Sequence, residues 1–372
     1  RDTDRSRGLG DVYKRQGSDR EMDRTELYRV STQILENIIN DEKNDNNILF
    51  DMDIWDWSQG VALYGIWKYY RLTGERRYLE YLTQWFDTKL NRPIVHNINT
   101  MAPLLTLCFL YEETGREEYR DYCESCAEWL LDGLPKTEMG GFQHVTIDSD
   151  NNQQLWADTV FMAVLFMGKI ASITGDERYA GECKKQFMLH IHYLSDKKTG
   201  LWCHGWSFER MDNYAGAFWA RGNCWFTIAA AELPGLLELE EWESDLILDA
   251  YRAQAAALCR YQSPDGLWHT LVDREDSYLE VSGSSGFAYG LLKGVRAGLL
   301  PASCRDAALR AAQAVRAHIG PDGLVGQVSY GTIVADTLEY YKNVPLRPTG
   351  YGQNLALMML VELLVWDAQG LL

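Results

Sequence analysis

Apolar residues recur along most of the chain at intervals of three and four, the spacing that places side chains on one face of an α-helix. The runs Val61–Leu72 and Leu104–Tyr111 are examples. Strand patterns are weak, and only short loop stretches such as Leu267–Val272 are candidates for pairing. The pattern therefore predicts an all-α protein.

A short phrase, Thr-Gly and then Tyr after three further residues, separates successive helical runs. It begins at Thr73, Thr114 and Thr174. Glycine after a periodic run indicates a helix end, because glycine adopts the left-handed backbone without a Cβ clash. The charged residues that follow suit the first turn of another helix. Each phrase therefore predicts a tight connection between two helices.

A second phrase joins Gly to Leu or Phe, often with an aromatic residue or His close behind. It begins at Gly141, Gly200, Gly266 and Gly323. A recurrence of roughly sixty residues fits a helical hairpin with its loops. Repeated antiparallel hairpins predict a closed toroid with an inner ring of helices inside an outer ring, and an open helical solenoid is the alternative. In a toroid the glycine-aromatic loops would gather at one end, where a pocket can form.

The composition predicts one folded unit after a short extension. The chain has 372 residues, 46% of them hydrophobic, and no linker-like stretch divides it, so residues 22–372 are expected to form a single domain. Residues 1–21 are expected to be a disordered or artefactual N-terminal extension. Their start is charged and without period, and Asp11–Gln16 back-translates to a transposon-end adapter used in sequencing libraries.

The net charge of −17 argues against nucleic acid or an anionic membrane surface as the main partner. No apolar stretch approaches the ~20 residues of a membrane span, and no signal-peptide core is present, which predicts a cytoplasmic protein. The eight cysteines form no regular framework, so buried free thiols are expected. Cys123 and Cys126 form a CxxC, but no second pair completes a metal site.

Polar and aromatic residues concentrate between residues 140 and 226. Asp158 precedes an apolar helix, where it is either a helix-capping acid or a chemical group. Arg221 and Asn223 lie between Trp219 and Trp225, and Arg and Asn resist burial without partners. Indole faces stack on the C–H faces of sugars, and Arg pairs with carboxylates. The cluster therefore indicates sugar-acid binding.

A similar cluster, Trp55–Gly60, precedes the helix at Val61. Asp56 and Ser58 are candidate helix caps, but two tryptophans and Gln59 beside them favour the lining of a pocket. The sequence shows no metal-ligand spacing, no phosphate-binding glycine loop and no GxSxG.

These stretches resemble the unsaturated rhamnogalacturonyl hydrolases, glycoside hydrolase family 105. The matching segments are Gln154–Thr159, Thr199–Trp206, Trp219–Trp225, Trp55–Gly60 and Ser285–Gly294. They occur in order from about residue 22 to the end of the chain. The resemblance implies an (α/α)6 barrel, in agreement with the hairpin repeat.

The resemblance also implies a reaction and a set of site residues. The family hydrates the C4=C5 double bond of a terminal unsaturated uronic acid, and Asp158 would be the general acid, with its pKa raised by burial against Trp156. Arg221 would hold an anionic or hydroxyl-rich part of the ligand, with Trp219 as a stacking platform. The full set of implied substrate-binding residues is Trp57, Gln59, Asn99, His144, Trp156, His204, Trp219, Arg221 and Trp225.

One position departs from the family pattern. Asn99 stands where the family often has a second acid, and an amide can neither donate a proton as an acid nor act as a carboxylate base, so Asn99 would bind substrate or water. No metal or organic cofactor is indicated, and the expected partner is a small acidic oligosaccharide. The alternatives are an unsaturated glucuronyl hydrolase, a noncatalytic carbohydrate-binding barrel, and an α/α-barrel epimerase or glucanase.

Overall fold

The computed structural model describes residues 23–40 and 51–372. The extension predicted at residues 1–21 lies outside this range. The described chain is built almost entirely of helices, joined by short turns at one end and by longer loops with two small β-ladders at the other. None of the helices in the described ranges has both the length and the apolar character needed to cross a membrane.

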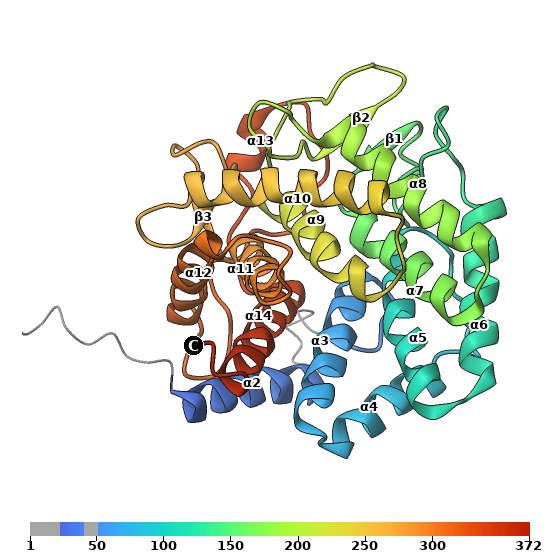
Figure 1. Cartoon of the computed structure of the whole chain (residues 1–372), viewed down its shortest axis with the longest axis horizontal. Coiled ribbons are helices and arrows are strands. Elements are labelled where there is room, and N and C mark those ends of the chain that lie inside the picture. Colours follow the sequence, from blue (N-terminus) through green and yellow to red (C-terminus); the bar gives the residue numbers. More distant parts are fainter. Residues whose placement is uncertain (1–22, 41–50) are drawn as a thin grey trace, which may run out of the picture.

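Six outer helices surround six inner ones (Figure 1). The outer helices are α2 (Arg24–Ile39), α4 (Arg76–Asp87), α6 (Glu117–Glu128), α8 (Glu177–Leu194), α10 (Glu241–Tyr261) and α12 (Arg305–Ala317). The inner helices are α3 (Trp57–Thr73), α5 (Ala102–Thr114), α7 (Leu165–Thr174), α9 (Ala220–Glu232), α11 (Val281–Arg296) and α14 (Gly350–Ala368). In Figure 1, α11 and α14 lie inside α12 and α2.

The ring closes because the last inner helix, α14, packs on the first, α3. The Asn354 amide donates to the Ser58 carbonyl oxygen across this junction at 2.8 Å. The prediction of a closed toroid is therefore confirmed, and an open solenoid is wrong. α5 and α14 are apolar around most of their circumference, as suits helices with neighbours on every side, whereas α4 and α12 each have one apolar face.

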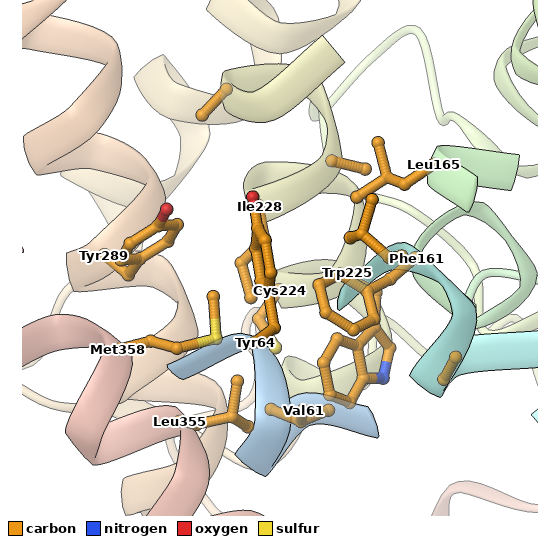
Figure 2. Packing of buried hydrophobic residues seen from close by; sticks show 14 of the residues in the cluster. Val61, Tyr64, Phe161, Leu165, Cys224, Trp225, Ile228, Tyr289, Leu355 and Met358 are labelled. Atoms are coloured by element: carbon orange, nitrogen blue, oxygen red, sulfur yellow. The ribbon is translucent and has the colours of Figure 1, made fainter. Parts of the chain in front are cut away.

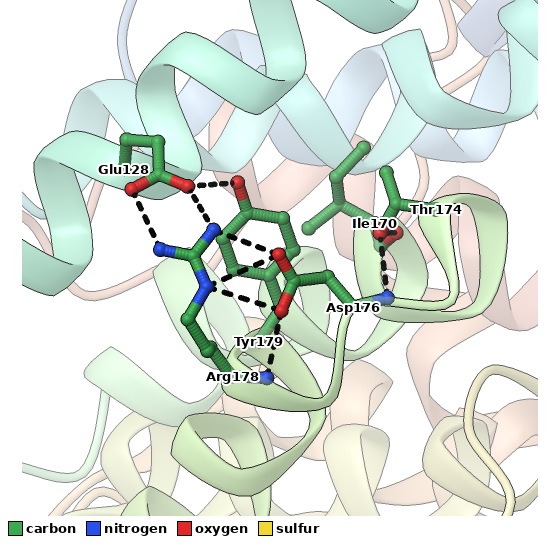
Figure 3. Close-up of polar contacts among 6 residues, drawn as sticks. All are labelled: Glu128, Ile170, Thr174, Asp176, Arg178 and Tyr179. Atoms are coloured by element: carbon green, nitrogen blue, oxygen red, sulfur yellow. Dashed lines mark hydrogen bonds and ion pairs between the residues drawn. The ribbon is translucent and has the colours of Figure 1, made fainter.

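The Thr-Gly turns end the inner helices α3, α5 and α7, as predicted. Gly74, Gly115 and Gly175 have φ values of 71°, 68° and 71°, in the left-handed region that favours glycine. Figure 3 shows the third turn, where the Thr174 hydroxyl donates to the Ile170 carbonyl oxygen at 2.9 Å. The Gly175 amide donates to the Ala171 carbonyl oxygen at 2.8 Å, which satisfies one of the carbonyl groups that a helix end leaves free.

The tyrosine of the repeated phrase ties its outer helix to the preceding one. The Tyr179 hydroxyl donates to Glu128 on α6 at 2.6 Å (Figure 3), and the Tyr119 hydroxyl donates to Asp87 on α4 at 2.8 Å. In the first turn Arg77 makes the equivalent link, to Glu36 on α2 at 2.8 Å. The phrase thus recurs because it both turns the chain and joins neighbouring hairpins.

The glycine-aromatic loops lie at the opposite end, where each outer helix leads to the next inner helix. Two short antiparallel ladders form there: β1 (Gln154–Trp156) with β2 (Gly205–Ser207), and β3 (Trp268–His269) with β4 (Leu279–Glu280). The pairing expected within Leu267–Val272 is confirmed at β3. A short helix, α13 (Leu338–Lys342), belongs to the same end of the barrel.

Side chains from the inner helices fill the middle of the ring. Figure 2 shows Tyr64, Phe161, Trp225 and Met358 meeting there from different helices, and all four are at most 2% exposed. This packing separates the two ends of the barrel. The end with the inner-helix C-termini contains a cavity of about 510 Å³ lined by Tyr64, Lys68, Glu232, Lys293 and neighbouring residues.

Candidate active site

Asp158 lies between strand β1 and the π-helical turn η3 (Val160–Val164), which leads into α7. The backbone carbonyl of Asp158 accepts hydrogen bonds from the amides of Phe161 and Met162 at 3.1 and 3.0 Å. The carboxylate itself caps no helix: its Oδ2 is buried without a hydrogen-bond partner, while the side chain as a whole is 17% exposed. The structure therefore shows no hydrogen-bonded cap by the Asp158 side chain, while its position before η3 still suits an acid that interacts with the helix dipole.

His204, which follows the Gly-Leu-Trp phrase at Gly200, lies beside this carboxylate. Nε2 of His204 lies 3.4 Å from Oδ2 of Asp158, longer than the ~2.7–3.2 Å of a well-formed N–H···O bond. Neither atom has another partner. The two groups are close enough to influence each other's protonation, and open enough for a ligand to alter their contact.

The pKa of Asp158 differs from the sequence-based expectation. Burial alone would raise it, but His204 beside the carboxylate and the charge of Arg221 outweigh burial and hold the pKa of Asp158 below its ordinary value. The expectation of a raised pKa was wrong for the ligand-free protein, because it considered Trp156 and not the donors on the other side. Asp158 is a carboxylate at neutral pH in the free protein.

The other ring nitrogen of His204, Nδ1, lies 2.9 Å from the hydroxyl of Tyr341 on α13. His204 is 1% exposed, and burial lowers its pKa despite the nearby Asp158, so its imidazole is neutral at pH 7. The ring therefore lies between a carboxylate and a phenol, with one nitrogen facing each.

His144 and Trp156 form the adjoining wall of the site. Their rings stack at 4.4 Å and 9°, and Trp156 meets the edge of His204 at 5.4 Å. Nδ1 of His144 lies 2.7 Å from the hydroxyl of Thr159, the residue after Asp158. Burial lowers the pKa of His144 to about 4, so this imidazole is also neutral at pH 7.

Trp219 and Arg221, at the start of α9, continue the wall beyond His204. The Trp219 ring lies 4.3 Å from the His204 ring, and the Arg221 guanidinium lies 4.5 Å over the indole. Trp219 is only 2% exposed. A sugar could stack on Trp219 only if His204 or Arg221 moved away from it.

The guanidinium of Arg221 is occupied by the loop that follows α12. It donates to the Ser329 carbonyl and hydroxyl oxygens at 2.9 and 2.6 Å and to the Tyr330 carbonyl oxygen at 3.0 Å. Glu280, fully buried, accepts from the backbone amide of the same Ser329 at 3.0 Å. In the free protein Arg221 thus holds a loop beside Asp158 and adds positive charge there, with few donors left for a ligand carboxylate.

Trp57, at the start of α3, is the most accessible indole among the predicted site residues. It is partly exposed, stacks on Tyr351 at 4.8 Å, and meets Trp225 edge-on at 6.0 Å. Trp225 is 0% exposed and packs on Phe161 in the core, so it supports the site from below. Arg221 lies 4.6 Å over the other stacked ring, Tyr351, which links this side to the Trp219 wall.

Gln59, in the first turn of α3, and Asn99, in the turn before α5, belong to the same end of the barrel. The Gln59 amide donates to the Asp51 carbonyl oxygen at 2.9 Å, and its own oxygen is buried without a partner. Asn99 begins the 3-10 turn before α5 and is partly exposed. The capping oxygen of that turn comes from Asn97, which accepts from the amides of Asn99 and Thr100, so the Asn99 side chain is not needed for the cap.

Comparison with known proteins identifies the family. The model for Glycosyl Hydrolase Family 88 matches residues 30–366. This chain belongs to glycosyl hydrolase family 88. It is 36% identical over 320 residues to the unsaturated rhamnogalacturonyl hydrolase YesR of Bacillus subtilis (strain 168), a match that covers 85% of this chain and 91% of that protein.

Two further relatives extend the comparison. An unsaturated 3S-rhamnoglycuronyl hydrolase of Alteromonas sp. (strain LOR) is 24% identical over 328 residues, covering 84% of this chain and 78% of that protein. A solved structure from Salmonella enterica serovar Paratyphi A, described as a possible GH105 member, has a TM-score of 0.89 at 37% identity and covers 93% of this chain and 96% of that one. The resemblance seen in the sequence is confirmed, and this family 88 protein is a glycoside hydrolase.

The structure brings most of the predicted site residues of this hydrolase to one end of the barrel, around Asp158. Sequence reasoning missed Tyr341, Tyr351, Thr159 and Ser329. Thr159 adjoins Asp158 and could have been found from its position, but Tyr341 is 137 residues from its partner His204 and carries no local signal. Within the described residues, no three His, Cys, Asp or Glu side chains are grouped so that they could hold a metal ion.

Proposed function

We propose that this family 88 hydrolase removes a terminal 4,5-unsaturated galacturonyl residue from rhamnogalacturonan oligosaccharides, with Asp158 as the catalytic acid. The observation that carries the proposal is the Asp158 carboxylate, whose Oδ2 is buried against His204 without a hydrogen bond, at the end of the barrel where aromatic groups gather. The similarity to YesR over 85% of the chain supports the substrate class.

In the proposed reaction, Asp158 donates its proton to C4 of the double bond, which leaves positive charge shared between C5 and the ring oxygen. Water then adds at C5 and gives its proton back to Asp158, which acts as the base. The resulting hemiketal opens to a ketone, and the hemiacetal formed at C1 expels the linked sugar as an alcohol. One carboxyl group thus serves both proton transfers, consistent with the amide at Asn99.

The lowered pKa of Asp158 in the free protein is compatible with this role because the substrate is itself an anion. A uronate bound at this end of the barrel adds negative charge, and a nearby like charge raises the pKa of a carboxyl group. The dependence of kcat/KM on pH reports the free enzyme, and that of kcat reports the complex. We therefore expect the loss of kcat on the alkaline side to occur at higher pH than the loss of kcat/KM.

The fold also supplies attraction for an acidic ligand in a chain with a net charge of −17. All six inner helices begin at this end of the barrel, and the start of a helix carries partial positive charge. The residues at or just before these starts are Trp57, Asn99, Asp158, Trp219, Glu280 and Thr349. The partial positive charge of these helix starts, together with the charge of Arg221, offsets part of the negative field where the uronate would bind.

The test is the loss of the ultraviolet absorbance of the C4=C5 bond when the purified protein meets an unsaturated rhamnogalacturonan disaccharide. We expect loss with the native protein and a decrease of at least about 10²- to 10⁴-fold in Asp158→Asn, the range of a general acid's contribution. Asp150→Asn is the matched control, because Asp150 is an exposed carboxylate in the loop that precedes β1. Loss of activity in both variants would contradict the assignment of Asp158.

The second candidate is hydrolysis of a different unsaturated uronide, favoured by the similarity to the 3S-rhamnoglycuronyl hydrolase. The same assay with unsaturated glucuronyl substrates distinguishes the two, because the linked sugar would change while Asp158 remains essential. Absorbance loss only with the second substrate class would keep the mechanism and replace the substrate. No loss with either class, together with binding of the oligosaccharides, would indicate a noncatalytic carbohydrate-binding barrel.

We further propose that the enzyme acts in the cytoplasm on short products of pectin breakdown and needs neither metal nor organic cofactor. The proposed steps use only a carboxyl group, water and the substrate, so activity should persist in the presence of a chelator. Loss of activity on chelation that a divalent metal restores would contradict this mechanism.

A further inference from the structure

The contact between His204 and Tyr341 bears on which nitrogen of the His204 ring carries the proton. A neutral imidazole carries one proton, on either nitrogen, and the hydrogen bond at one nitrogen determines which tautomer is present. In this site Nδ1 faces the Tyr341 hydroxyl at 2.9 Å and Nε2 faces Oδ2 of Asp158 at 3.4 Å. The location of that single proton decides what His204 can do for Asp158.

The hydrogen bonds around Tyr341 determine where its own proton points. The backbone amide of Ala335 donates to the Tyr341 oxygen at 3.2 Å, so that oxygen already accepts one hydrogen bond. Burial raises the pKa of Tyr341 well above its usual value, so the phenol keeps its proton at any physiological pH. His204 Nδ1 is the acceptor within reach, so the phenol donates to Nδ1 and the imidazole proton lies on Nε2.

We propose that Tyr341 is a positioning residue that holds His204 in the Nε2–H tautomer, so that His204 can donate to the Asp158 carboxylate but cannot accept the Asp158 proton. This inference rests on the proposed function of Asp158 as an acid. It concerns the relative free energy of the two tautomers of His204, and Tyr341 acts through His204.

The tautomer decides whether His204 donates a hydrogen bond to Asp158 or accepts one from it. With the proton on Nε2, His204 stabilises the carboxylate that forms when Asp158 gives its proton to C4, which is help realised in the transition state. With the proton on Nδ1, the lone pair of Nε2 would face a protonated Asp158 and accept its hydrogen. The acid would then be directed at the imidazole and away from the substrate.

The tautomer can be measured without any substrate, by 15N NMR of protein labelled in histidine. The His204 signals are assigned by their absence in His204→Gln. We expect the native protein to show Nδ1 as an unprotonated ring nitrogen and Nε2 as a protonated one. The reverse assignment would overturn the proposal.

A pair of variants isolates the contribution of Tyr341. In Asp158→Asn the carboxylate that also favours Nε2–H is gone, and an amide can pair with either tautomer, so Tyr341 alone should keep the native signals. In Asp158→Asn combined with Tyr341→Phe, the two nitrogen signals should move toward each other as the tautomers mix. Signals unchanged between these two variants would refute a role for Tyr341.

Kinetics of Tyr341→Phe in the otherwise native protein supply the second readout. We expect kcat to fall about ten- to one hundred-fold, less than the loss from removing the acid itself, with KM changed less than about three-fold. Tyr340→Phe is the matched control, because its hydroxyl accepts from the amide of Ile333, at 3.3 Å, and lies outside the His204 contact. An effect confined to KM, or equal in the two variants, would contradict the proposal.

Circular dichroism and a thermal melt establish that each variant is folded, and Phe preserves the ring that packs on His204 and Trp219. If Tyr341→Phe does not fold, the NMR assignment in the native protein still decides the tautomer. If the native protein hydrolyses no unsaturated uronide, the proposed function fails while the NMR result stands, so the two failures are distinguishable.

Discussion

Asp158 at one end of the barrel and Glu232 at the other differ in their hydrogen bonds and ion pairs. At the end with the inner-helix N-termini, Oδ2 of Asp158 has no hydrogen bond, lies 3.4 Å from His204, and is influenced by the charge of Arg221. At the other end Glu232 is 3% exposed and fully bonded. Its oxygens accept from the Tyr64 and Tyr289 hydroxyls and pair with the ammonium groups of Lys68 and Lys293.

The difference separates the carboxylate that we propose as the catalytic acid from a carboxylate held by a full set of ion pairs and hydrogen bonds. Burial alone would raise the pKa of Glu232, but the charges of Lys293 and Lys68 outweigh it and hold the pKa far below its ordinary value. Glu232 ends α9, where the helix dipole is negative, so the two lysines are needed to keep it charged. Asp158 has no such permanent partners in bonding distance, so its protonation can change when a ligand arrives.

The largest expected effect on stability comes from removing the charge of Glu232, whose oxygens are fully bonded. Glu232→Gln leaves Lys68 and Lys293 buried near each other without their counter-charge, which should lower the free energy of unfolding by about 3–5 kcal/mol. Urea unfolding at neutral pH measures this loss. The activity per folded molecule should be unchanged, because the filled core lies between Glu232 and the site.

Asp158→Asn is the matching substitution at the other end of the barrel, and its effect on stability is compared with that of Glu232→Gln. It removes a carboxylate whose burial cost is offset by His204 and Arg221 and whose Oδ2 has no hydrogen bond, so the free energy of unfolding should fall by no more than about 1 kcal/mol. Equal destabilisation by the two substitutions would show that both carboxylates are structural.

The next expected effect is a loss of stability at acid pH that arises from His144, at the end of the barrel with Asp158. The pKa of His144 is lowered by burial to about 4, against about 6.5 when unfolded, so the unfolded chain binds the proton first as pH falls. The stability that neutral His144 contributes is complete above pH 6.5 and decreases as pH falls to about 4, by about 3 kcal/mol. Urea unfolding of His144→Gln at pH 7 and pH 4 should show a smaller difference than the native protein does.

The control for this prediction is His192→Gln, because His192 is an exposed histidine on α8. Its substitution should leave the difference between pH 7 and pH 4 as in the native protein. If His144→Gln behaves like the control, the acid sensitivity does not arise at this end of the barrel.

An effect of opposite sign is expected at Asp56, beside Trp57. Burial, aided by the negative charge of Asp148, raises the pKa of Asp56 to about 6. The folded protein then holds the proton more tightly than the unfolded chain, so Asp56 lowers stability as pH rises from about 4 to 6. Asp56→Asn should stabilise the protein by about 3 kcal/mol at pH 7.5. The gain, measured by urea unfolding, should vanish toward pH 4.

The smallest effect is expected at the exposed ion pairs of the Thr-Gly turns. Arg178 contacts Glu128 and Asp176 but is 59% exposed (Figure 3). Water and salt screen such pairs, so Arg178→Ala should cost at most about 1 kcal/mol, and less at high salt. Thermal melts at low and high salt measure this. A loss as large as that of Glu232→Gln would mean that exposure does not distinguish the two networks.

Much of the fold was predictable because its signals are local. The left-handed glycine at Gly175 and the threonine before it act within one helical turn, so the sequence alone identifies the connection. The position of Asp158 before an apolar helix was also visible, as was the aromatic character of its neighbours. Its pKa was not, because that depends on His204 and Arg221, which only the fold brings near.

The sequence by itself determined the helices and their repeat as hairpins, since helix periodicity and end signals arise from residues a few positions apart. It also singled out Asp158 through a family resemblance, and the catalytic role of Asp158 stays a prediction. Only the tertiary structure decided that Arg221 is bonded to Ser329, that Trp219 is covered, and that Tyr341 faces His204. These partners come from separate hairpins that meet only when the ring closes. The physical reason is that a contact across 137 residues depends on the packing of every hairpin between them.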